Sequence, residues 1–160
     1  MTEDLRARAW AAAATVCDPE LPALTIEDLG VLRAIHITGG DVEVEITPTY
    51  SGCPAMAMIK LDIETALHQA GITARVTTTL SPPWTTDWLT PAAHEKLRRD
   101  GIAPPPPASS RRALFGSPTI GCPRCASTDT EELAAFGSTA CKALWRCRAC
   151  REPFDLFKCH

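Results

Sequence analysis

Two cysteine pairs constrain the fold of this chain more than any other feature of its sequence. Segments 122–125 (CPRC) and 147–150 (CRAC) share the C-x-x-C spacing and stand about twenty residues apart. In a zinc ribbon, each such knuckle gives two thiolates to one tetrahedral ion. The sequence therefore predicts a small β zinc-ribbon domain that binds structural zinc through Cys122, Cys125, Cys147 and Cys150.

Other chemistry at these four cysteines fits less well. A segment of roughly forty residues cannot build a self-sufficient apolar core, so bound metal would contribute about 10 kcal/mol or more of folding free energy. Disulfides are disfavoured where thiols are kept reduced, and a thioredoxin-like redox pair would not need two copies. A single iron ion, as in a rubredoxin-like site, and an iron–sulfur cluster remain the alternatives to zinc.

The distribution of charge and apolar residues indicates a cytoplasmic protein. The net charge of −3 gives no whole-molecule attraction to nucleic acid or anionic lipid. No apolar run approaches the roughly 18 residues that span a bilayer, so no membrane partner is expected. The apolar segment Trp10–Val16 has acidic residues on both sides, which fits an amphipathic helix and not a secretory signal.

A proline-rich segment divides the chain. Residues 103–110 (APPPPASS) are typical of a stiff polyproline linker with a flexible end. Six of the eight cysteines follow that segment. We therefore predict an α/β domain at residues 1–102, a Pro/Ser-rich linker at 103–116 and the zinc ribbon at 117–160.

The first domain reads as an α+β fold. Thr2 is the expected cap of a first helix, whose apolar residues recur at helical spacing as far as Val16. That helix should stop at Asp18-Pro19, because the residue before a proline is pushed out of the α region. Segments 31–37 and 42–46 read as two strands joined by a Gly-Gly-Asp turn.

The rest of this domain completes a small three-stranded sheet packed with helices. A second helix should begin at Pro54, bury the face that runs from Ala55 to Ala70, and stop at Gly71. Segment 72–80 reads as the third strand, and a short helix should begin at about Pro91. The predicted order is αββαβ plus a short helix.

One cysteine stands alone in segment 47–56 (TPTYSGCPAM), where a strand ends and a helix begins. Unpaired N–H groups and the helix dipole stabilise negative charge there, so we expect the pKa of Cys53 to lie below about 8.5 and its thiolate to be reachable. A thiolate is both a nucleophile and a soft-metal ligand, and four hydroxyl donors stand beside it in the sequence: Thr47, Thr49, Tyr50 and Ser51. The alternative is a small buried residue that fits a tight junction.

Several of these segments together resemble a known family. Segments 18–32 (DPELPALTIEDLGVL) and 47–56, with the helix after them, resemble the iron–sulfur-assembly family of small α/β proteins, also called the metal–sulfur cluster biosynthetic or SufT-like family. Segment 80–105 and the cysteine-rich C-terminal segment are similar to one branch, the PaaD-like subunits of bacterial phenylacetyl-CoA epoxidase (phenylacetate-CoA oxygenase) systems. The resemblance implies that Cys53 is the functional thiol and that Asp18 and Glu20 shape its pocket. We include Thr49 in the same candidate site for transient metal binding.

That resemblance implies an accessory role in aerobic phenylacetate degradation, not catalysis. The protein would help to mature a metal centre of the epoxidase, either the di-iron site of the oxygenase subunit or the [2Fe–2S] cluster of the reductase subunit. Iron or an iron–sulfur cluster would be held transiently at Cys53, and the ribbon would dock the client. The oxygenase or reductase subunit is thus the expected partner, and a homodimer remains open.

Three other functions fit the sequence less well. Direct oxygenation by a ferritin-like di-iron site needs helical Glu-x-x-His pairs, and the sequence contains none. A thiol-dependent enzyme using Cys53 has no histidine placed by sequence as its base. A zinc-ribbon adaptor that binds protein remains an alternative. For a nucleic-acid adaptor the charge is unfavourable, since residues 117–160 hold six Lys+Arg against five Asp+Glu, and only the basic cluster Lys142–Arg151 supports it.

Four further residues have no assigned role. Cys17 ends an alanine-rich segment and is expected to be a small buried residue, with the alternative that it approaches the pocket of the neighbouring Asp18 and Glu20. Cys141 lies six residues before Cys147, too far to belong to its knuckle, and is expected to be a buried or spare thiol. Cys159 and His160 could join a site only if the tail folds back.

Overall fold

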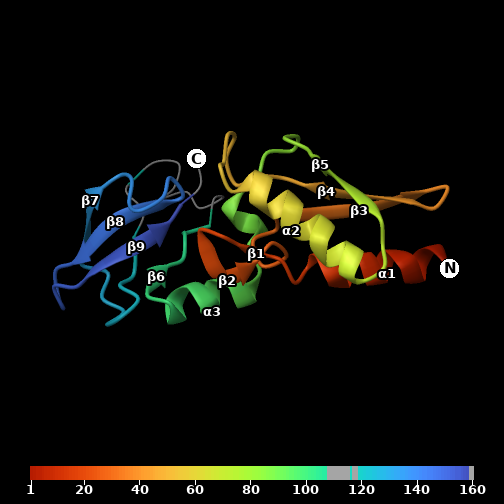
Figure 1. Ribbon diagram of the computed structural model, residues 1–160. Helices are drawn as coiled ribbons and strands as arrows, with labels where there is room; N and C mark the ends of the chain where they lie inside the picture. The colour runs from red at the N-terminus through yellow and green to blue at the C-terminus, as the bar shows by residue number, and fades with distance from the viewer. Residues whose placement is uncertain (108–115, 117–118, 159–160) are drawn as a thin grey trace. The chain divides into compact units, whose positions relative to one another are not determined.

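The computed structural model describes residues 1–107, 116 and 119–158 of the 160. The chain divides into two compact units, Met1–Trp84 and Thr85–His160, whose elements are labelled in Figure 1. The helices among the described residues include none that is long and apolar enough to cross a membrane.

The first unit opens with helix α1 (Thr2–Ala13), which buries Ala9 and Ala13. This helix begins and ends earlier than expected. Its N-cap is Met1 and not Thr2, and it stops at Ala13 instead of continuing to Val16. The reason lies in the next segment, because the carbonyl of Val16 accepts a hydrogen bond from the backbone N–H of Ile26 at 2.8 Å.

That segment forms a two-stranded antiparallel sheet that the sequence did not suggest. Strand β1 (Cys17–Asp18) pairs with strand β2 (Leu21–Thr25), and Cys17 lies opposite Thr25. The intervening Pro19-Glu20 forms the turn. A strand this short needs tertiary support, and the buried residues Leu21 and Leu24 supply it by joining the apolar core.

The main sheet of the first unit has the order β3-β4-β5 (Figure 1). Strands β3 (Leu32–Thr38) and β4 (Asp41–Ile46) form the expected hairpin, and Gly39 and Gly40 have φ of 60° and 98° in its turn. Two successive residues with positive φ give the turn geometry that matches the strand twist. Strand β5 (Ala74–Thr78) lies parallel to β4 and is shorter than the expected segment 72–80.

Helix α2 (Met56–Gln69) connects β4 to β5 and buries Ile59, Ile63 and Leu67. Their spacing of four residues puts them on one face, which packs with α1 and β5. Along strand β4 every second side chain faces the core, so that Val42, Val44 and Ile46 are all buried. The predicted αββαβ order is confirmed, and its core lies between the helices and one face of the sheet.

The second unit begins with a 3₁₀ turn (Thr86–Trp88) and helix α3 (Pro91–Arg99). The start of α3 is where the sequence predicted it. Pro91 occupies the first turn, where its missing N–H costs nothing, and the Thr90 hydroxyl accepts a hydrogen bond from the Ala93 N–H at 3.1 Å.

A four-stranded sheet of order β6-β9-β8-β7 completes this unit. Strands β7 (Thr130–Ala134), β8 (Lys142–Cys147) and β9 (Pro153–Phe157) are antiparallel neighbours, as in a β ribbon. The fourth strand, β6 (Ile102–Ala103), pairs in parallel with β9.

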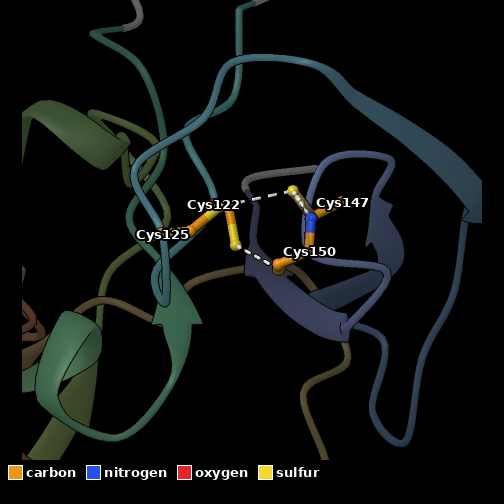
Figure 2. Close-up of side chains that lie close together, drawn as sticks. All are labelled: Cys122, Cys125, Cys147 and Cys150. Carbon is orange, nitrogen blue, oxygen red and sulfur yellow. Dashed lines mark hydrogen bonds between the residues drawn. The ribbon is translucent and has the colours of Figure 1, made fainter.

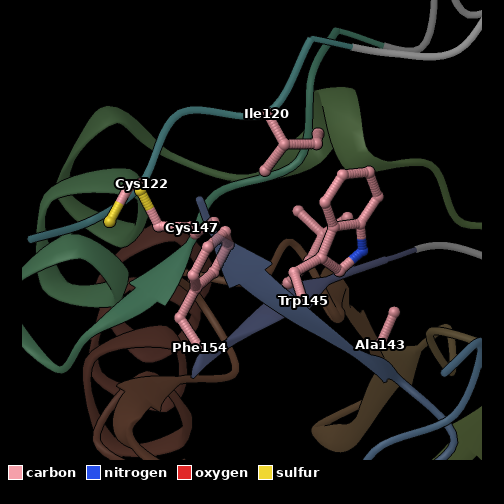
Figure 3. Close-up of a cluster of buried hydrophobic side chains, with 8 residues drawn as sticks. Ile120, Cys122, Ala143, Trp145, Cys147 and Phe154 are labelled. Carbon is pink, nitrogen blue, oxygen red and sulfur yellow. The ribbon is translucent and has the colours of Figure 1, made fainter. Parts of the chain in front are cut away.

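The ribbon has its own small apolar core (Figure 3). Trp145 and Phe154, opposite each other on β8 and β9, are its two aromatic members. The other members are Ala103, Ile120, Cys122, Ala143, Cys147 and Leu156. Two of the eight are knuckle cysteines, so the metal site borders this core directly.

The boundary between the two units does not lie where the composition of the chain changes. The sequence placed α3 in the first domain and began the linker at residue 103, whereas the compact units meet between Trp84 and Thr85. Ala103 is 1% exposed and belongs to the ribbon core. The division into residues 1–102, 103–116 and 117–160 remains a prediction about domain organisation, and most of the linker, 108–115, is outside the described residues.

Candidate metal centre and candidate thiol site

The four knuckle cysteines converge on one point. Their sulfur atoms all lie within 4.8 Å of one another, and Figure 2 shows the side chains facing each other from two loops. The distance is 3.8 Å from Cys122 Sγ to Cys150 Sγ and 3.6 Å from Cys125 Sγ to Cys147 Sγ. Four thiolates about 2.3 Å from a central ion at tetrahedral angles would be about 3.8 Å apart. The residues therefore fit one tetrahedral ion.

Disulfides do not account for this arrangement. A disulfide bond would bring two sulfur atoms to about 2.05 Å, and all seven described cysteines are free. The arrangement is also symmetric, because each knuckle contributes to both of the short sulfur–sulfur contacts.

The backbone shapes the two knuckles in the same way. The N–H of Cys122 donates to the carbonyl of Ser127 at 2.9 Å, and the N–H of Cys147 donates to the carbonyl of Glu152 at 3.0 Å. Both bonds join residues five apart and close a tight loop around the cysteine pair. This local geometry explains why the C-x-x-C spacing can place two sulfur atoms on one ion.

Backbone N–H groups also point at the sulfur atoms. The N–H of Arg124 donates to Cys122 Sγ at 3.4 Å, and that of Cys150 donates to Cys147 Sγ at 3.5 Å. The bond from Cys150, with further bonds from its neighbours, lowers the pKa of Cys147 to about 7. These donors hold negative charge on sulfur, which is the form that binds metal.

The pKa of Cys150 shifts in the opposite direction. The backbone N–H of Glu152 lowers the pKa of Cys150, but burial and hydrogen bonds with the other three thiols outweigh it and raise the pKa to about 12. Four thiols this close together cannot all ionise without a compensating cation. A bound divalent ion would supply that charge and displace the remaining protons.

Cys53 lies in the loop between β4 and α2, in a different environment from the one expected. The sequence predicted a thiolate at the N-terminus of the helix, but α2 begins at Met56 and its N-cap is Ala55. Cys53 is two residues before that cap, in a turn where its N–H donates to the Tyr50 carbonyl at 3.3 Å. Gly52 has φ of 79° in this turn, a conformation that favours glycine.

The expected low pKa of Cys53 is wrong, and so is its expected accessibility. The side chain is buried, with 8% of the residue exposed. Burial raises the pKa of the thiol, and the negative charges of Glu20 and Asp18 raise it further. Hydrogen bonds from the Ala55 backbone and the Tyr50 side chain act in the opposite direction but do not compensate. The thiol is therefore protonated at neutral pH in the absence of a bound cation.

The structure does bring Asp18, Glu20 and Cys53 into electrostatic range of one another. Asp18 is buried, and its Oδ1 accepts hydrogen bonds from the N–H groups of Glu20 at 2.7 Å and Leu21 at 3.2 Å. These bonds build the β1–β2 turn and so position the acidic motif. Sequence inspection alone could not have found this hairpin, because two residues of strand carry no periodicity.

Two threonines belong to the Cys53 loop. Thr49 is half-buried, and its predicted part in the site remains a prediction. Thr47 is 1% exposed, and its Oγ1 has no hydrogen-bond partner among the described residues. An unsatisfied buried hydroxyl is uncommon in a native fold.

The unassigned cysteines fall outside both sites. Cys17 is exposed in β1 and not buried, because α1 ends before it. Cys141 is buried as expected, with its Sγ 3.1 Å from the Thr139 hydroxyl. Cys159 and His160 lie outside the described residues.

Family comparisons match two separate parts of the chain. Residues 6–78 match the family described as iron-sulfur cluster assembly protein, and residues 106–158 match the PaaD zinc beta ribbon domain. The chain is 50% identical, over 94% of its length and 90% of the other protein's, to a protein of Escherichia coli (strain K12) that is provisionally named as one subunit of 1,2-phenylacetyl-CoA epoxidase.

Solved structures resemble part of this chain. A domain of unknown function, DUF59, from Bacillus anthracis has a TM-score of 0.56 at 24% identity, covering 59% of this chain and 92% of that one. A conserved hypothetical protein from Thermotoga maritima has a TM-score of 0.49 at 33% identity, covering 57% and 92%. The likeness to the Bacillus anthracis domain supports the α+β fold.

The fold and the four-cysteine site thus define a protein of the iron–sulfur cluster assembly class that carries a zinc-ribbon domain. Sequence identity to the E. coli protein across nearly the whole chain defines the family more narrowly. The chain belongs to the PaaD family, together with its E. coli relative.

Proposed function

We propose that this protein is a cytoplasmic, non-catalytic accessory factor that helps to assemble a metal centre of a phenylacetyl-CoA epoxidase. Its relative is named as a subunit of that system, and its first unit matches an iron–sulfur cluster assembly family. The client would be the oxygenase or the reductase subunit. Iron or an iron–sulfur cluster is the cargo in this proposal.

One observation carries the proposal: the Cys53 thiol lies within the field of two carboxylates, Asp18 and Glu20. Their charges oppose ionisation of the thiol, so they make Cys53 a poor nucleophile at neutral pH. The same charges attract a cation, and a cation next to the sulfur would drive off its proton. The surroundings of Cys53 therefore favour metal binding over thiol catalysis.

The chemistry of cargo binding follows from these groups. Sulfur is a soft ligand and the carboxylates are hard oxygen donors, a mixture that suits iron. Binding would release a proton from Cys53, which makes the affinity dependent on pH. The unsatisfied Thr47 hydroxyl, in the same loop, is a further polar group without a partner in the described residues.

The ribbon would hold zinc permanently. The observed sulfur–sulfur distances fit a single tetrahedral ion. In an iron–sulfur cluster the four thiolates are divided between two or more irons, so sulfur atoms bound to different irons would be farther apart than around one ion. Zinc is preferred to a lone iron because structural sites with four cysteines most commonly hold it. In this proposal the ribbon docks the client.

The test is to co-express the epoxidase subunits with wild-type protein or with Cys53→Ser, and to measure iron in the purified oxygenase and reductase subunits. We expect the variant to fold but to leave the client with low metal occupancy. Cys17→Ser, which removes an exposed thiol, is the matched control and should behave as wild type. Full metal loading of the client by Cys53→Ser would contradict the proposal.

A further inference from the structure

A pocket next to the first knuckle has no part in the proposed function. It lies within the second unit and has a volume of about 520 Å³. Three segments line it: helix α3, the prolines that follow β6, and the loop 121–126 that holds the first cysteine pair. The packing of β6 and of the adjacent prolines against the ribbon creates this pocket.

The pocket carries positive charge. Arg98, from α3, and Arg124, from the knuckle, both line it, and none of the described lining residues is acidic. Each arginine has one glutamate nearby: Glu95 is 3.7 Å from Arg98 and Glu152 is 3.9 Å from Arg124. Ion pairs this long and this exposed contribute little. Both guanidinium groups are therefore free to exchange these partners for a better one.

His94 is a further polar residue of the pocket, and the positive charge of Arg98 acts on it. His94 lies one helical turn before Arg98 and also lines the pocket. Burial and the charge of Arg98 lower the pKa of His94. The histidine therefore stays neutral at physiological pH and offers one N–H donor and one acceptor. The other described lining residues are largely proline, which has no N–H, and apart from the metal ligand Cys122 they contribute no polar side chain.

The metal site explains only part of this charge. Four thiolates around a divalent ion carry a net charge of −2, which accounts for an arginine as close as Arg124. Arg98 belongs to another element, and its ion pair is with its own helix. The thiolates also repel an anion, so a ligand must engage both arginines to overcome that repulsion.

We propose that this pocket binds an oxyanion, a carboxylate or a phosphate group, between Arg98 and Arg124. Guanidinium groups bind both kinds of anion through paired, charge-assisted hydrogen bonds. A carboxylate would come from an acidic segment of a partner protein, and a phosphate from a small molecule. The site is separate from Cys53, so it can be present whether or not the metal-transfer function is correct.

The experiment is a titration of the full-length, metal-loaded protein followed by ¹H–¹⁵N NMR. The probes are inorganic phosphate and an acetylated, amidated tri-glutamate peptide at constant pH and ionic strength. We expect saturable shifts of the Gly121 and Ala126 amides with at least one probe. Arg98→Gln and Arg124→Gln should each weaken that binding about ten-fold or more. Arg99→Gln, exposed on the same helix but outside the pocket, should bind as wild type.

Each outcome has a definite meaning. Binding of phosphate alone assigns the site to a small molecule, and tighter binding of the peptide assigns it to an acidic partner. Because Arg124 stands within a knuckle, zinc content is measured for every variant, and Arg98→Gln decides if Arg124→Gln loses metal. The proposal is overturned if neither probe gives saturable shifts, or if Arg98→Gln binds as tightly as wild type.

Discussion

Ala126 and Arg151 occupy the same position in the two knuckles and share the same unusual backbone conformation. Each directly follows the second cysteine of its pair, and their φ angles are 62° and 66°. They are the only non-glycine residues with positive φ in the described part of the chain. Left-handed backbone costs a residue with a Cβ about 1 kcal/mol or more. Both knuckles therefore hold strain at the point where the chain turns away from the metal.

Replacing either residue by glycine should stabilise the ribbon. Ala126→Gly and Arg151→Gly remove the Cβ that opposes positive φ, and we expect each to raise the free energy of unfolding by up to about 1 kcal/mol. Denaturant unfolding of the metal-loaded protein measures this effect. Ala143→Gly, in the regularly paired strand β8, is the control and should destabilise. A loss of stability in both knuckle variants would contradict the argument from strain.

Loss of one knuckle thiol should unfold the second unit and leave the first intact. Cys147→Ser removes a ligand that is also part of the ribbon core, and most of the folding free energy of a small ribbon comes from its metal. Metal analysis should show zinc lost, and NMR should show the residues of the first unit unchanged. The control is Cys141→Ser, a buried cysteine outside the site, which should retain zinc. Retention of zinc by Cys147→Ser would contradict the assignment.

Removal of the metal should also release α3. Strand β6 joins α3 to β9, and the buried Ala103 belongs to the ribbon core. Hydrogen exchange measured by mass spectrometry, with and without chelator, should show loss of protection at residues 91–103 together with β7, β8 and β9. The first unit, residues 1–84, should keep its protection. If residues 91–103 stayed protected with the first unit instead, the domain boundary predicted near residue 102 would be the correct one.

Neutralising the acids near Cys53 should make this thiol more reactive. The negative charges of Glu20 and Asp18 raise its pKa, so Glu20→Gln and Asp18→Asn should each lower that pKa and increase the alkylation rate at pH 7–8. Asn at position 18 retains the oxygen that accepts the two turn hydrogen bonds. The pH dependence of alkylation, followed by mass spectrometry at this single site, measures the effect. Unchanged rates in both variants would show that these carboxylates do not act on the thiol.

Metal binding at Cys53 should depend on pH in a defined direction. The thiol is protonated at neutral pH because burial raises its pKa, so each bound ion displaces one proton. Affinity for ferrous iron should therefore rise about tenfold per pH unit until the pH reaches the thiol pKa. Anaerobic titrations of the zinc-loaded protein, in which the four ribbon thiols are occupied, measure this response, and Cys53→Ser is the control that should lose it. Affinity that is independent of pH between 6 and 8 would rule out the thiol as a ligand.

The structural features that depend on a few neighbouring residues could be predicted from the sequence. The two C-x-x-C pairs specified the ligands of the metal site, because each knuckle closes through bonds between residues five apart. The glycine pair at 39–40 specified the β3–β4 hairpin, and Thr90-Pro91 specified the start of α3. In each case a few neighbouring residues fix the geometry.

The environment of Cys53 and the extent of the second unit, by contrast, depend on tertiary structure. The thiol was expected to be ionised by a helix N-terminus, but its pKa follows from burial and from carboxylates more than thirty residues away in the chain. Ala103 lies within a proline-rich segment and yet is buried with residues of strands that follow about forty to fifty residues later. Burial and electrostatic fields depend on which distant segments meet in space, and this information is not contained in the spacing of neighbouring residues.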